Sequence, residues 1–430
     1  MSTRPSHSAP VFRLDLFRQF PTLMHYESFG GYKALARALV RGPAAVIDEI
    51  TAAGLRGRGG AAFSTGSKLR MVATAPAGEK YLICNADEGE PGTFKDRFIM
   101  THIPFQLLEG MAIAALAVGA RQGFIYIRHE YPEAQETMRL SITAARAAGL
   151  LGPDILSSGF AFDVELFSGA GSYLCGEETA LLSSMEGKKG RPRLKPPYPT
   201  ESGLWGKPTL INNVETLANI PPIIANGAEW YRCLGTADSP GTKLISLSGD
   251  VACRGLYEVP FGTTFRQIID CYGGGMRNGR PLKAVNIGGA SGVVVPSEEL
   301  DYSLEYRACG QRGITIGSGA VFVMDDSRSV LENVRNRVEF FLHESCGKCT
   351  PCREGLRQAG RIVTRVLAGD ALLADVTNLE RYTRALQNAA FCGLGQAAGN
   401  SLASSLKYFR PEYAAGCRDE YRQSPEEATA

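Results

Sequence analysis

Three closely spaced cysteines, with a fourth far downstream, constrain this chain of 430 residues more than any other feature. Cys346, Cys349 and Cys352 lie within the stretch Ser345–Gly355, and Cys392 follows much later. Thiols at i, i+3 and i+6 can face one centre from a single tight loop, and a distant fourth thiol completes the ligand set of a [4Fe–4S] cluster. The sequence therefore predicts a metal site that carries electrons.

Zinc and a disulfide are the two other interpretations of these cysteines. Structural zinc usually takes two thiols from each of two separate loops, so a run of three favours iron and sulfur. A disulfide requires an oxidising compartment, which nothing in the sequence indicates. His343 lies three residues before Cys346, but four thiolates already suffice, so we expect it to be a neighbour of the site and not a ligand.

The composition describes a soluble, multi-domain globular protein, with 44% hydrophobic and 21% charged residues. A net charge of +2 without blocks of like charge gives no electrostatic signature of nucleic-acid binding. The longest run of small apolar residues, Met111–Ala120, is too short to span a bilayer, and the polar start of the chain does not resemble a signal peptide. We therefore expect a cytoplasmic protein that binds no nucleic acid and does not insert into a membrane.

The segment Gly54–Lys68 combines five glycines with three cations. Glycines let main-chain N–H groups approach an anion, and Arg56, Arg58 and Lys68 supply countercharge. The segment therefore predicts a cradle for a phosphate or a cofactor, although a flexible surface loop remains the simpler alternative. No glycine–lysine–serine/threonine follows at the P-loop spacing, which disfavours an ATPase.

Strands and helices alternate after this loop. The pattern predicts strands at Lys80–Cys84, Gly123–Ile127 and Phe162–Leu166, and helices at Pro104–Ala120 and Pro132–Ala148. Such alternation predicts a doubly wound, largely parallel sheet. The acidic turn Asn85–Gly92 leaves the first strand at its carboxyl end, where ligands bind in such sheets. Taken alone, this turn is equally consistent with a solvated surface loop.

A second glycine loop, Ser168–Gly176, joins a predicted strand to a predicted helix. This is the context in which such a loop binds a phosphate-bearing cofactor, although Gly169-x-Gly171 departs from the usual dinucleotide fingerprint. Glu177 and Glu178 either complement the helix dipole or accept from a ribose 2′-hydroxyl, which would favour NAD over NADP. The proline-rich stretch that follows is rigid enough to hold the ring of Tyr198 against a ligand.

The last third of the chain divides into two parts. Short segments at Lys243–Ser248, Gly255–Val259, Thr264–Asp270 and Ala284–Ile287 predict a compact β–β–α–β unit. From Ser327 onward the pattern is helical. Thr377-x-x-Glu380 resembles a capping box, which predicts a helix that ends at Cys392-Gly393.

At this point the chain resembles a known family. The family comprises the NADH-oxidising flavoprotein of respiratory complex I, its 51-kDa type subunit, and the similar diaphorase subunits of soluble NAD-dependent formate dehydrogenases and NAD-reducing hydrogenases. The motifs that carry the resemblance are Gly54–Gly60, Asn85–Gly92, Cys175–Leu181, Arg193–Tyr198, Gly203–Thr209, Ile211–Thr216 and Ser345–Cys352.

The resemblance implies a modified Rossmann-like FMN-binding domain of α/β class, then a small ubiquitin-like α+β domain, then a helical bundle that carries the cluster. The corresponding division is an N-terminal helical segment with the glycine-rich loop at 1–65, the FMN- and NAD-binding domain at 66–233, the ubiquitin-like domain at 234–326 and the bundle at 327–430.

The resemblance also implies the residues that bind cofactors. FMN would be held by Gly57, Arg58, Lys68, Asn85, Asp87, Glu88, Gly176, Asn212, Asn213 and Thr216. NAD(H), the substrate, would be held by Phe63, Glu90, Glu178 and Tyr198. The cluster would be held by Cys346, Cys349, Cys352 and Cys392. No side chain is expected to be catalytic in itself, because the hydride chemistry belongs to the flavin.

Three residues depart from the family pattern. Ser64, Leu69 and Met71 stand where relatives usually have proline and aromatic residues, so we expect an aromatic wall of the NAD pocket to be missing and NAD binding to be weaker or altered. The start of the chain around Gly30–Leu35 looks more like the soluble dehydrogenase relatives. We expect a separate thioredoxin-like [2Fe–2S] subunit and a further iron–sulfur or catalytic subunit as partners.

These observations favour the NAD-reactive module of a soluble, multi-subunit formate dehydrogenase or hydrogenase. The NADH-oxidising subunit of complex I is the second hypothesis. A non-catalytic subunit that keeps only the cluster is a third, and the intact loops Asn85–Gly92 and Cys175–Leu181 speak against it. A kinase-like nucleotide binder lacks any motif for metal and phosphate.

Overall fold

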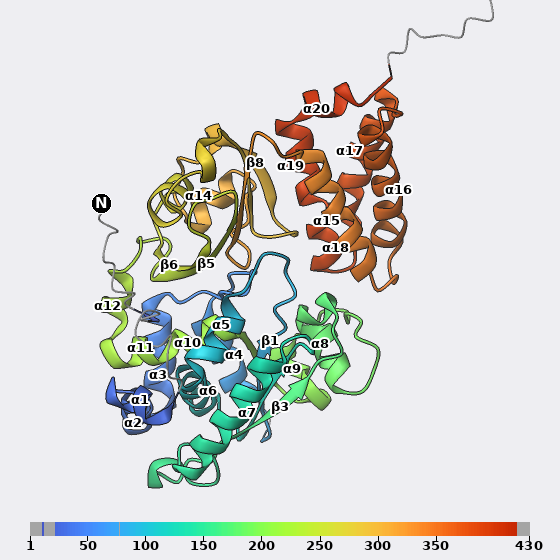
Figure 1. The fold of residues 1–430 in the computed structure, drawn as a ribbon. Coiled ribbons are helices and arrows are strands. Elements are labelled where there is room, and N and C mark those ends of the chain that lie inside the picture. The colour runs from blue at the N-terminus through green and yellow to red at the C-terminus, as the bar shows by residue number, and fades with distance from the viewer. Residues whose placement is uncertain (1–10, 13–21, 77, 419–430) are drawn as a thin grey trace, which may run out of the picture.

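The computed structural model describes residues 11–12, 22–76 and 78–418. Figure 1 shows three bodies: a sheet flanked by helices, a second sheet above it, and a helical bundle beside that second sheet. Together they match the predicted order of an α/β domain, a small α+β domain and a C-terminal bundle. The exact division at residues 65, 233 and 326 remains our proposal.

Four parallel strands form the first sheet, in the order β3-β2-β1-β4. Their bounds are β1 Tyr81–Ala86, β2 Gln122–Ile127, β3 Asp163–Ser168 and β4 Thr209–Asn213. The three predicted strands are confirmed, but β4 was missed. We expected Asn212 or Asn213 to cap the helix that follows, and Asn213 does so, because its Oδ1 accepts the Glu215 N–H at 3.0 Å. These two asparagines also end a strand, with Cys84 opposite Asn212 and Asn85 opposite Asn213. The loops after β1 and β4 therefore leave the sheet side by side.

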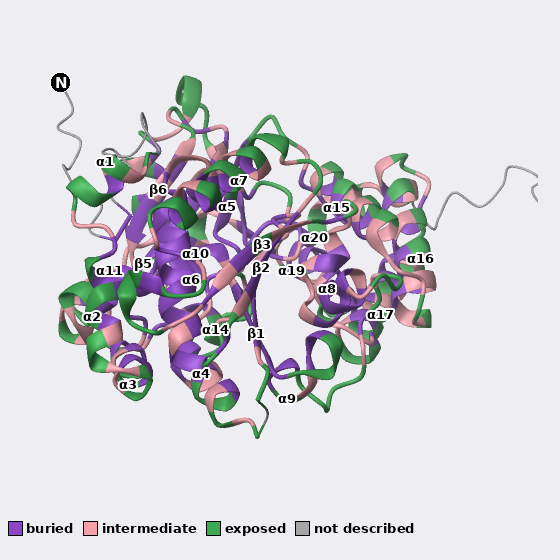
Figure 2. Ribbon diagram, turned by 90° about the horizontal axis from the view of Figure 1, so that it is seen from below, coloured by how far each residue is buried: buried purple, intermediate pink, exposed green. Residues whose placement is uncertain are grey.

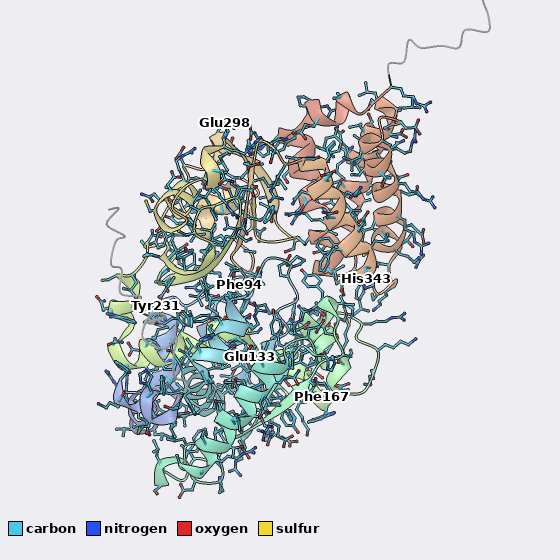
Figure 3. The ribbon with its side chains drawn as sticks, viewed as in Figure 1. Phe94, Glu133, Phe167, Tyr231, Glu298 and His343 are labelled. Carbon is cyan, nitrogen blue, oxygen red and sulfur yellow. The ribbon has the colours of Figure 1, made fainter. Side chains whose placement is uncertain are left out.

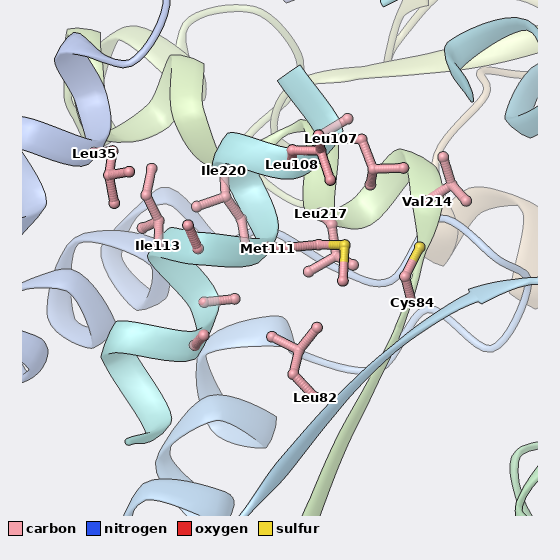
Figure 4. Packing of buried hydrophobic residues seen from close by; sticks show 14 of the residues in the cluster. Leu35, Leu82, Cys84, Leu107, Leu108, Met111, Ile113, Val214, Leu217 and Ile220 are labelled. Carbon is pink, nitrogen blue, oxygen red and sulfur yellow. The ribbon is translucent and has the colours of Figure 1, made fainter. Parts of the chain in front are cut away.

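Helix α6, Pro104–Val118, forms the centre of the largest core. It is apolar on nearly every face, as expected for a helix that is surrounded by protein. Figure 4 shows Met111 and Leu108 packed among Leu217, Leu82 and Leu35. Gly110 lets α6 approach α10, Val214–Ala218, because a Cβ at that position would lie 2.1 Å from the Leu217 carbonyl oxygen.

Other helices cover this sheet and its edges. They are α1 Leu23–Ser28, α2 Lys33–Arg41, α3 Pro43–Ala53, α4 Thr65–Thr74, α5 Lys95–His102, α7 Pro132–Ala147, α8 Glu178–Met185, α9 Pro199–Ser202, α11 Ile220–Asn226 and α12 Ala228–Arg232. Short 3-10 turns lie at η1 Ile155–Ser157, η2 Tyr173–Gly176 and η3 Leu204–Gly206. β1, β2, β4 and α6 are mostly buried, whereas the edge strand β3 is partly exposed and much of α2 and α3 faces outward (Figure 2).

The second sheet has five strands in the order β6-β5-β9-β7-β8. Their bounds are β5 Thr242–Gly249, β6 Gly255–Pro260, β7 Leu282–Ile287, β8 Val293–Pro296 and β9 Ala320–Asp325. β5 pairs parallel with β9, and the other pairs are antiparallel. The predicted unit omitted β8 and β9, and its helix is a short α13, Phe265–Gln267, followed by a π-helical turn, η4 Ile268–Tyr272. Small turns complete the unit at η5 Arg277–Gly279, η6 Ser297–Glu299 and α14 Tyr306–Gln311.

The bundle consists of α15 Val330–Glu344, α16 Thr350–Leu367, α17 Leu373–Ala389, α18 Gly393–Ala397, α19 Asn400–Tyr408 and α20 Arg410–Ala415. The capping box predicted at Thr377 is wrong. The Asp375 carboxylate instead accepts the Leu372 N–H at 2.8 Å, and α17 begins at Leu373, ahead of the predicted start. The predicted end is also wrong, because α17 stops at Ala389 and Cys392 is the N-cap of α18.

Within the part of the chain that the structure describes, no single helix has both the length and the apolar character needed to cross a membrane. One pair, α5 with α6, meets that requirement only jointly and across a bend of 97°.

Candidate cofactor and cluster site

The glycine-rich loop is fixed against the turn between β4 and α10. The Gly57 N–H donates to the Phe63 carbonyl oxygen at 2.8 Å and closes the loop on itself. The Arg58 N–H donates to Thr216 Oγ1 at 2.8 Å. A Cβ at Gly59 would lie 3.0 Å from the Cβ of Asn213, so glycine is what allows this close approach. The loop thus lines the carboxyl edge of the sheet with main chain, as predicted for a cradle.

The Arg58 guanidinium points away from that edge. It is buried and donates to the hydroxyls of Tyr231 and Tyr306 and to the carbonyl oxygen of Pro240, at 2.8 to 3.1 Å. Its carbon also lies 4.7 Å from the centroid of the Phe261 ring. Arg58 remains a predicted FMN residue, but its side chain connects the loop to the second sheet.

Two buried polar atoms at the edge of the first sheet have no hydrogen-bond partner among the described residues. They are Asp87 Oδ2 and Asn212 Nδ2. Burial raises the pKa of Asp87 to about 7, against the opposing charge of Arg128. Unpaired buried polar groups are costly and rare. Asp87 Oδ2 lacks a donor and Asn212 Nδ2 lacks an acceptor, which indicates that a polar ligand binds here.

Gly176 lies next to Asp87, at the same edge of the sheet. A Cβ on Gly176 would lie 3.4 Å from the Asp87 carbonyl oxygen, and its own carbonyl oxygen accepts from Asn85 Nδ2 at 2.8 Å. The structure therefore brings Asn85, Asp87 and Gly176 together, at the edge of the sheet where β4 also ends with Asn212 and Asn213. A flavin carries both ring N–H donors and carbonyl acceptors, so these residues fit the expected FMN.

A buried ionic network lies directly behind Asn213. Lys95 Nζ contacts Asp96 at 2.6 Å, Glu215 at 3.0 Å and Asn213 Oδ1 at 3.1 Å, while Asn213 Nδ2 donates to Asp96 Oδ2 at 2.7 Å. Lys243, from the second sheet, contacts Glu215 at 2.5 Å. Burial lowers the pKa of Lys243 to about 7, although the charge of Glu215 opposes this shift. The network fixes the Asn213 amide and joins the two sheets.

Two acids of the turn after β1 are engaged with other parts of the protein. Glu88 accepts the N–H groups of Asp96 and Arg97 at 2.8 and 3.0 Å and thereby caps α5. Burial and the charge of Asp96 raise the pKa of Glu88 to about 7. Glu90 accepts from Tyr173 and from Ser291 of the second sheet. Both acids lie beside the predicted site, and their cofactor roles remain predictions.

Two of the predicted NAD residues are exposed to solvent and the other two are engaged with protein groups. Phe63 and Tyr198 are half-exposed, at 49% and 52% of their surface. Glu178 is bonded to Lys195 at 2.7 Å and to Lys68 at 3.3 Å. Burial favours the neutral form of Glu178, but the two lysines outweigh it and lower the pKa. Lys68 also donates to the Ile211 carbonyl oxygen at 2.8 Å, which places it at the end of β4.

The four predicted cluster cysteines line one cavity. The cavity also contains Leu174, Pro192, Phe391 and Leu394. All four thiols are free of disulfides. No group of three or more Cys, His, Asp or Glu residues in the described chain is arranged to hold a single metal ion. A cubane takes one thiolate on each of four irons, so four thiols that line one cavity fit the cluster.

Hydrogen bonds hold the cysteine loop in place. Lys348 Nζ donates to the Pro192 carbonyl oxygen at 2.9 Å and lies 3.8 Å from the Phe391 ring centroid. Arg353 donates to the Gly347 carbonyl oxygen at 2.8 Å. His343 is exposed and does not line the cavity; Figure 3 shows it at the end of α15 that faces α8.

A single four-residue turn, η2, connects the cofactor site to the cluster cavity. Gly176, at one end of η2, faces Asp87, and Leu174 lines the cysteine cavity. The Tyr173 N–H donates to Glu344 Oε2 at 3.0 Å, and the Tyr173 ring lies 5.1 Å from that of Phe340. Two residues of one short turn, Leu174 and Gly176, thus line the cluster cavity and face the expected flavin position.

Several residues of the site were missed by sequence reasoning. They are Lys95, Asp96, Arg128, Tyr173, Glu215, Lys243, Ser291 and Glu344. Lys95 and Asp96 lie three and four residues after Gly92, the end of the predicted acidic turn, and this adjacent pair of opposite charges was the available signal. Nothing local distinguishes Lys243 or Ser291, because their partners are far away in the chain.

We predict that Asp87→Ala weakens FMN binding. Loss of a charged hydrogen-bond acceptor corresponds to roughly a tenfold to hundredfold rise in the dissociation constant. The FMN content of the purified variant, read from its visible absorbance, is the measurement. Asp48→Ala removes an exposed aspartate on α3 and serves as the control. Retention of full FMN by Asp87→Ala would refute the assignment of Asp87.

We predict that Cys352→Ser lowers the iron content of the protein from about four atoms toward zero. Cys352 is buried at the first turn of α16, and burial raises the pKa of its thiol to about 11, so the metal must stabilise the thiolate. Cys233→Ser, at an exposed thiol away from the cavity, should keep its iron. Equal iron in both variants would contradict the proposed ligand set.

Comparisons with known proteins agree with this geometry. Residues 50–222 match the model of the Nuo51 FMN-binding domain, and residues 332–416 match the NADH-ubiquinone oxidoreductase-F iron-sulfur binding region. FMN and a [4Fe–4S] cluster are therefore the cofactors, as expected, and zinc and a disulfide are set aside.

Similar whole proteins extend this result. An NADH-quinone oxidoreductase subunit of Rhizobium meliloti (strain 1021) is 47% identical, over 91% of this chain and 94% of that protein. The HndC subunit of the NADP-reducing hydrogenase of Solidesulfovibrio fructosivorans is 44% identical, over 92% of this chain and 80% of that protein. A crystal structure of an NAD+-reducing [NiFe]-hydrogenase in the H2-reduced state has a TM-score of 0.83 at 38% identity, and the match covers 94% of this chain and 68% of that one.

These relatives are subunits of multi-subunit oxidoreductases. Both family models match in the order in which the structure places the flavin site and the cysteine cavity, and the NADH-quinone oxidoreductase subunits are more than 40% identical to this chain over nearly its whole length. The chain belongs to the family of 51-kDa-type subunits, the FMN- and [4Fe–4S]-binding NADH dehydrogenase subunits of NADH-quinone oxidoreductases and related hydrogenases.

Proposed function

We propose that this chain is the NAD-reactive module of a soluble oxidoreductase of the formate dehydrogenase or hydrogenase type. The observation that carries the proposal is the short turn η2. It lies between a site with unpaired buried polar atoms and a cavity lined by four cysteines. When bound, FMN exchanges a hydride with NAD(H) and passes single electrons to or from the cluster. The protein supplies binding, orientation and exclusion of water.

Each group of residues has a distinct part in this proposal. Asp87 and Asn212 orient the flavin through their free polar atoms, while the main chain of Gly57–Gly60 faces its phosphate. Lys68 lies between the two ligands, because it is bonded to β4 and to Glu178. Phe63 and Tyr198 offer half-exposed rings that can cover the bases of NAD(H) and keep water from the flavin.

Glu178 supports a preference for NAD over NADP. Its carboxylate is ionised, because Lys68 and Lys195 lower its pKa. An ionised carboxylate can accept from a ribose 2′-hydroxyl and repels a 2′-phosphate. The two lysines moderate this repulsion, so we expect a preference and not an absolute exclusion.

We propose a thioredoxin-like [2Fe–2S] subunit and a further iron–sulfur or catalytic subunit as partners, in the cytoplasm. The family membership supports partners in general, since its members occur in multi-subunit enzymes. The eleven free cysteines, including exposed Cys233 and Cys271, support a reducing compartment. The NADH-oxidising role in a complex I remains the second candidate, supported by the similarity to NADH-quinone oxidoreductase subunits.

An anaerobic titration of the purified protein with NADH tests the proposal. We expect NADH to bleach the flavin absorbance with about 1.5 equivalents per flavin, since one hydride carries two electrons, the flavin takes two and the cluster takes one. A flavin that dithionite bleaches but NADH does not would show a non-catalytic electron-transfer subunit instead.

Of the three residues that depart from the family pattern, we propose that Met71 is the one that changes the wall of the NAD pocket. Ser64 is the N-cap of α4, where its Oγ accepts the Ser67 N–H at 3.2 Å, and Leu69 is completely buried. Met71 is half-exposed on α4, which packs against α9 directly after Tyr198. Ser64 is exposed but short, so Met71 is the only one of the three that is both exposed and large enough to take the place of an aromatic side chain.

We predict that Met71→Phe tightens NADH binding by about two- to tenfold, because an added aromatic contact contributes about 0.5–1.5 kcal/mol. The dissociation constant for NADH, measured by titration of the flavin spectrum, is the readout. Met24→Phe, on α1, provides a matched control at an exposed methionine. Unchanged or weaker binding by Met71→Phe would show that this position does not line the pocket.

A further inference from the structure

Four donors already surround the carboxylate of Glu90. The Tyr173 hydroxyl donates to Oε2 at 2.7 Å, Ser291 Oγ to Oε2 at 2.8 Å and the Ser291 N–H to Oε1 at 2.9 Å. The Ala290 N–H is the fourth donor. A carboxylate offers about four lone-pair positions, so the acceptor capacity of Glu90 is filled.

Two of these donors belong to Ser291, in the loop Gly288–Gly292 between β7 and β8 of the second sheet. The loop is shaped around Glu90. A Cβ at Gly289 would lie 2.5 Å from Glu90 Cγ, and Gly289 has a φ of +77°. Glycine therefore permits both the conformation and the contact. Glu90 thus connects the flavin-binding domain to the second sheet.

The helical bundle holds the same loop from the other side. Arg337 of α15 donates to the Gly289 carbonyl oxygen at 2.9 Å, and Asn400 of α19 donates to that of Ser291 at 2.8 Å. Ser401 Oγ lies 3.1 Å from the carbonyl oxygens of both Ala290 and Gly292. The loop Gly288–Gly292 is therefore the junction at which the flavin domain, the second sheet and the cluster bundle meet.

The hydrogen bonds that Glu90 makes at this junction leave no free position on its carboxylate for a contact with NAD(H). The inference rests on the proposed function and on the contact with NAD(H) that the family resemblance implies for Glu90. A hydroxyl or amide of the dinucleotide can reach a filled carboxylate only by displacing a donor. Ser291 is the donor that leaves most easily, because its Oγ has an alternative acceptor in the Gly288 carbonyl oxygen at 3.3 Å.

We propose that NAD(H) and Ser291 compete for the carboxylate of Glu90, so that dinucleotide binding releases the Gly288–Gly292 loop from the flavin-binding domain. The loop stays attached to the bundle through Arg337, Asn400 and Ser401. The contact between the flavin domain and the cluster domain is then looser with nucleotide bound than without it.

Hydrogen–deuterium exchange of the FMN- and cluster-loaded protein tests this proposal directly. We expect saturating NAD+ to speed exchange of the Ser291 amide by about tenfold, because its N–H loses the Glu90 acceptor. Binding itself is followed separately by the change in the flavin spectrum. Binding without faster exchange at Ser291 would overturn the competition alone, whereas no binding of NAD+ or NADH would overturn it together with the proposed function.

A pair of variants gives an independent test. Ser291→Ala removes one competitor, so its dissociation constant for NAD+ should fall by about two- to tenfold, the value of one hydrogen bond. Ser318→Ala is the matched control, because Ser318 Oγ bonds Thr93 Oγ1 at 2.5 Å across the same pair of domains without touching Glu90. The control should bind NAD+ as the unmodified protein does. If Ser291→Ala binds NAD+ no more tightly than Ser318→Ala, the competition is refuted.

Discussion

The turn Tyr173–Gly176 is the constraint on which the function of this molecule depends. Its four residues reach from the polar edge of the first sheet to the cysteine cavity, and the Tyr173 N–H fixes the turn to Glu344 at the end of α15. The rate of electron transfer depends steeply on distance. The contacts that hold this turn in place therefore set how fast electrons pass between the flavin and the cluster. The packing of Tyr173 on Phe340 and the capping of α8 by Glu177 both serve that purpose.

The interface between the two sheets contains several buried charged residues. Arg58, Lys95, Glu215 and Lys243 are all buried. Arg58, Glu215 and Lys243 have partners on both sides of the seam between the two sheets, and Lys95 is bonded to Glu215 from the side of the first sheet. Phe94 lies at this seam (Figure 3), and its N–H donates to Ser246 of the second sheet at 3.1 Å. Buried ion pairs add little net stability, but breaking one is costly, so such a network fixes one relative position of two domains.

The sequence predicted those parts of the structure that depend on local patterns. The periodicity of Pro104–Val118 and the spacing of the first three cysteines are local signals, and both predictions hold. β4 was missed because Asn212 and Asn213 are poor strand formers that gain their place through pairing with β1. The start of α17 was missed because Asp375 offered a cap ahead of the predicted one. The partners of Arg58, Glu90 and Lys243 come from distant segments, and no local pattern encodes them.

The central claim is that one short turn couples a flavin that reacts with NADH to the cluster held by the four cysteines. Rapid mixing of the loaded protein with NADH, with frozen samples taken for electron paramagnetic resonance, tests it most directly. The account predicts that the signal of the reduced cluster rises within milliseconds of flavin bleaching. A flavin that NADH bleaches while the cluster stays oxidised, although dithionite reduces it, would contradict the account.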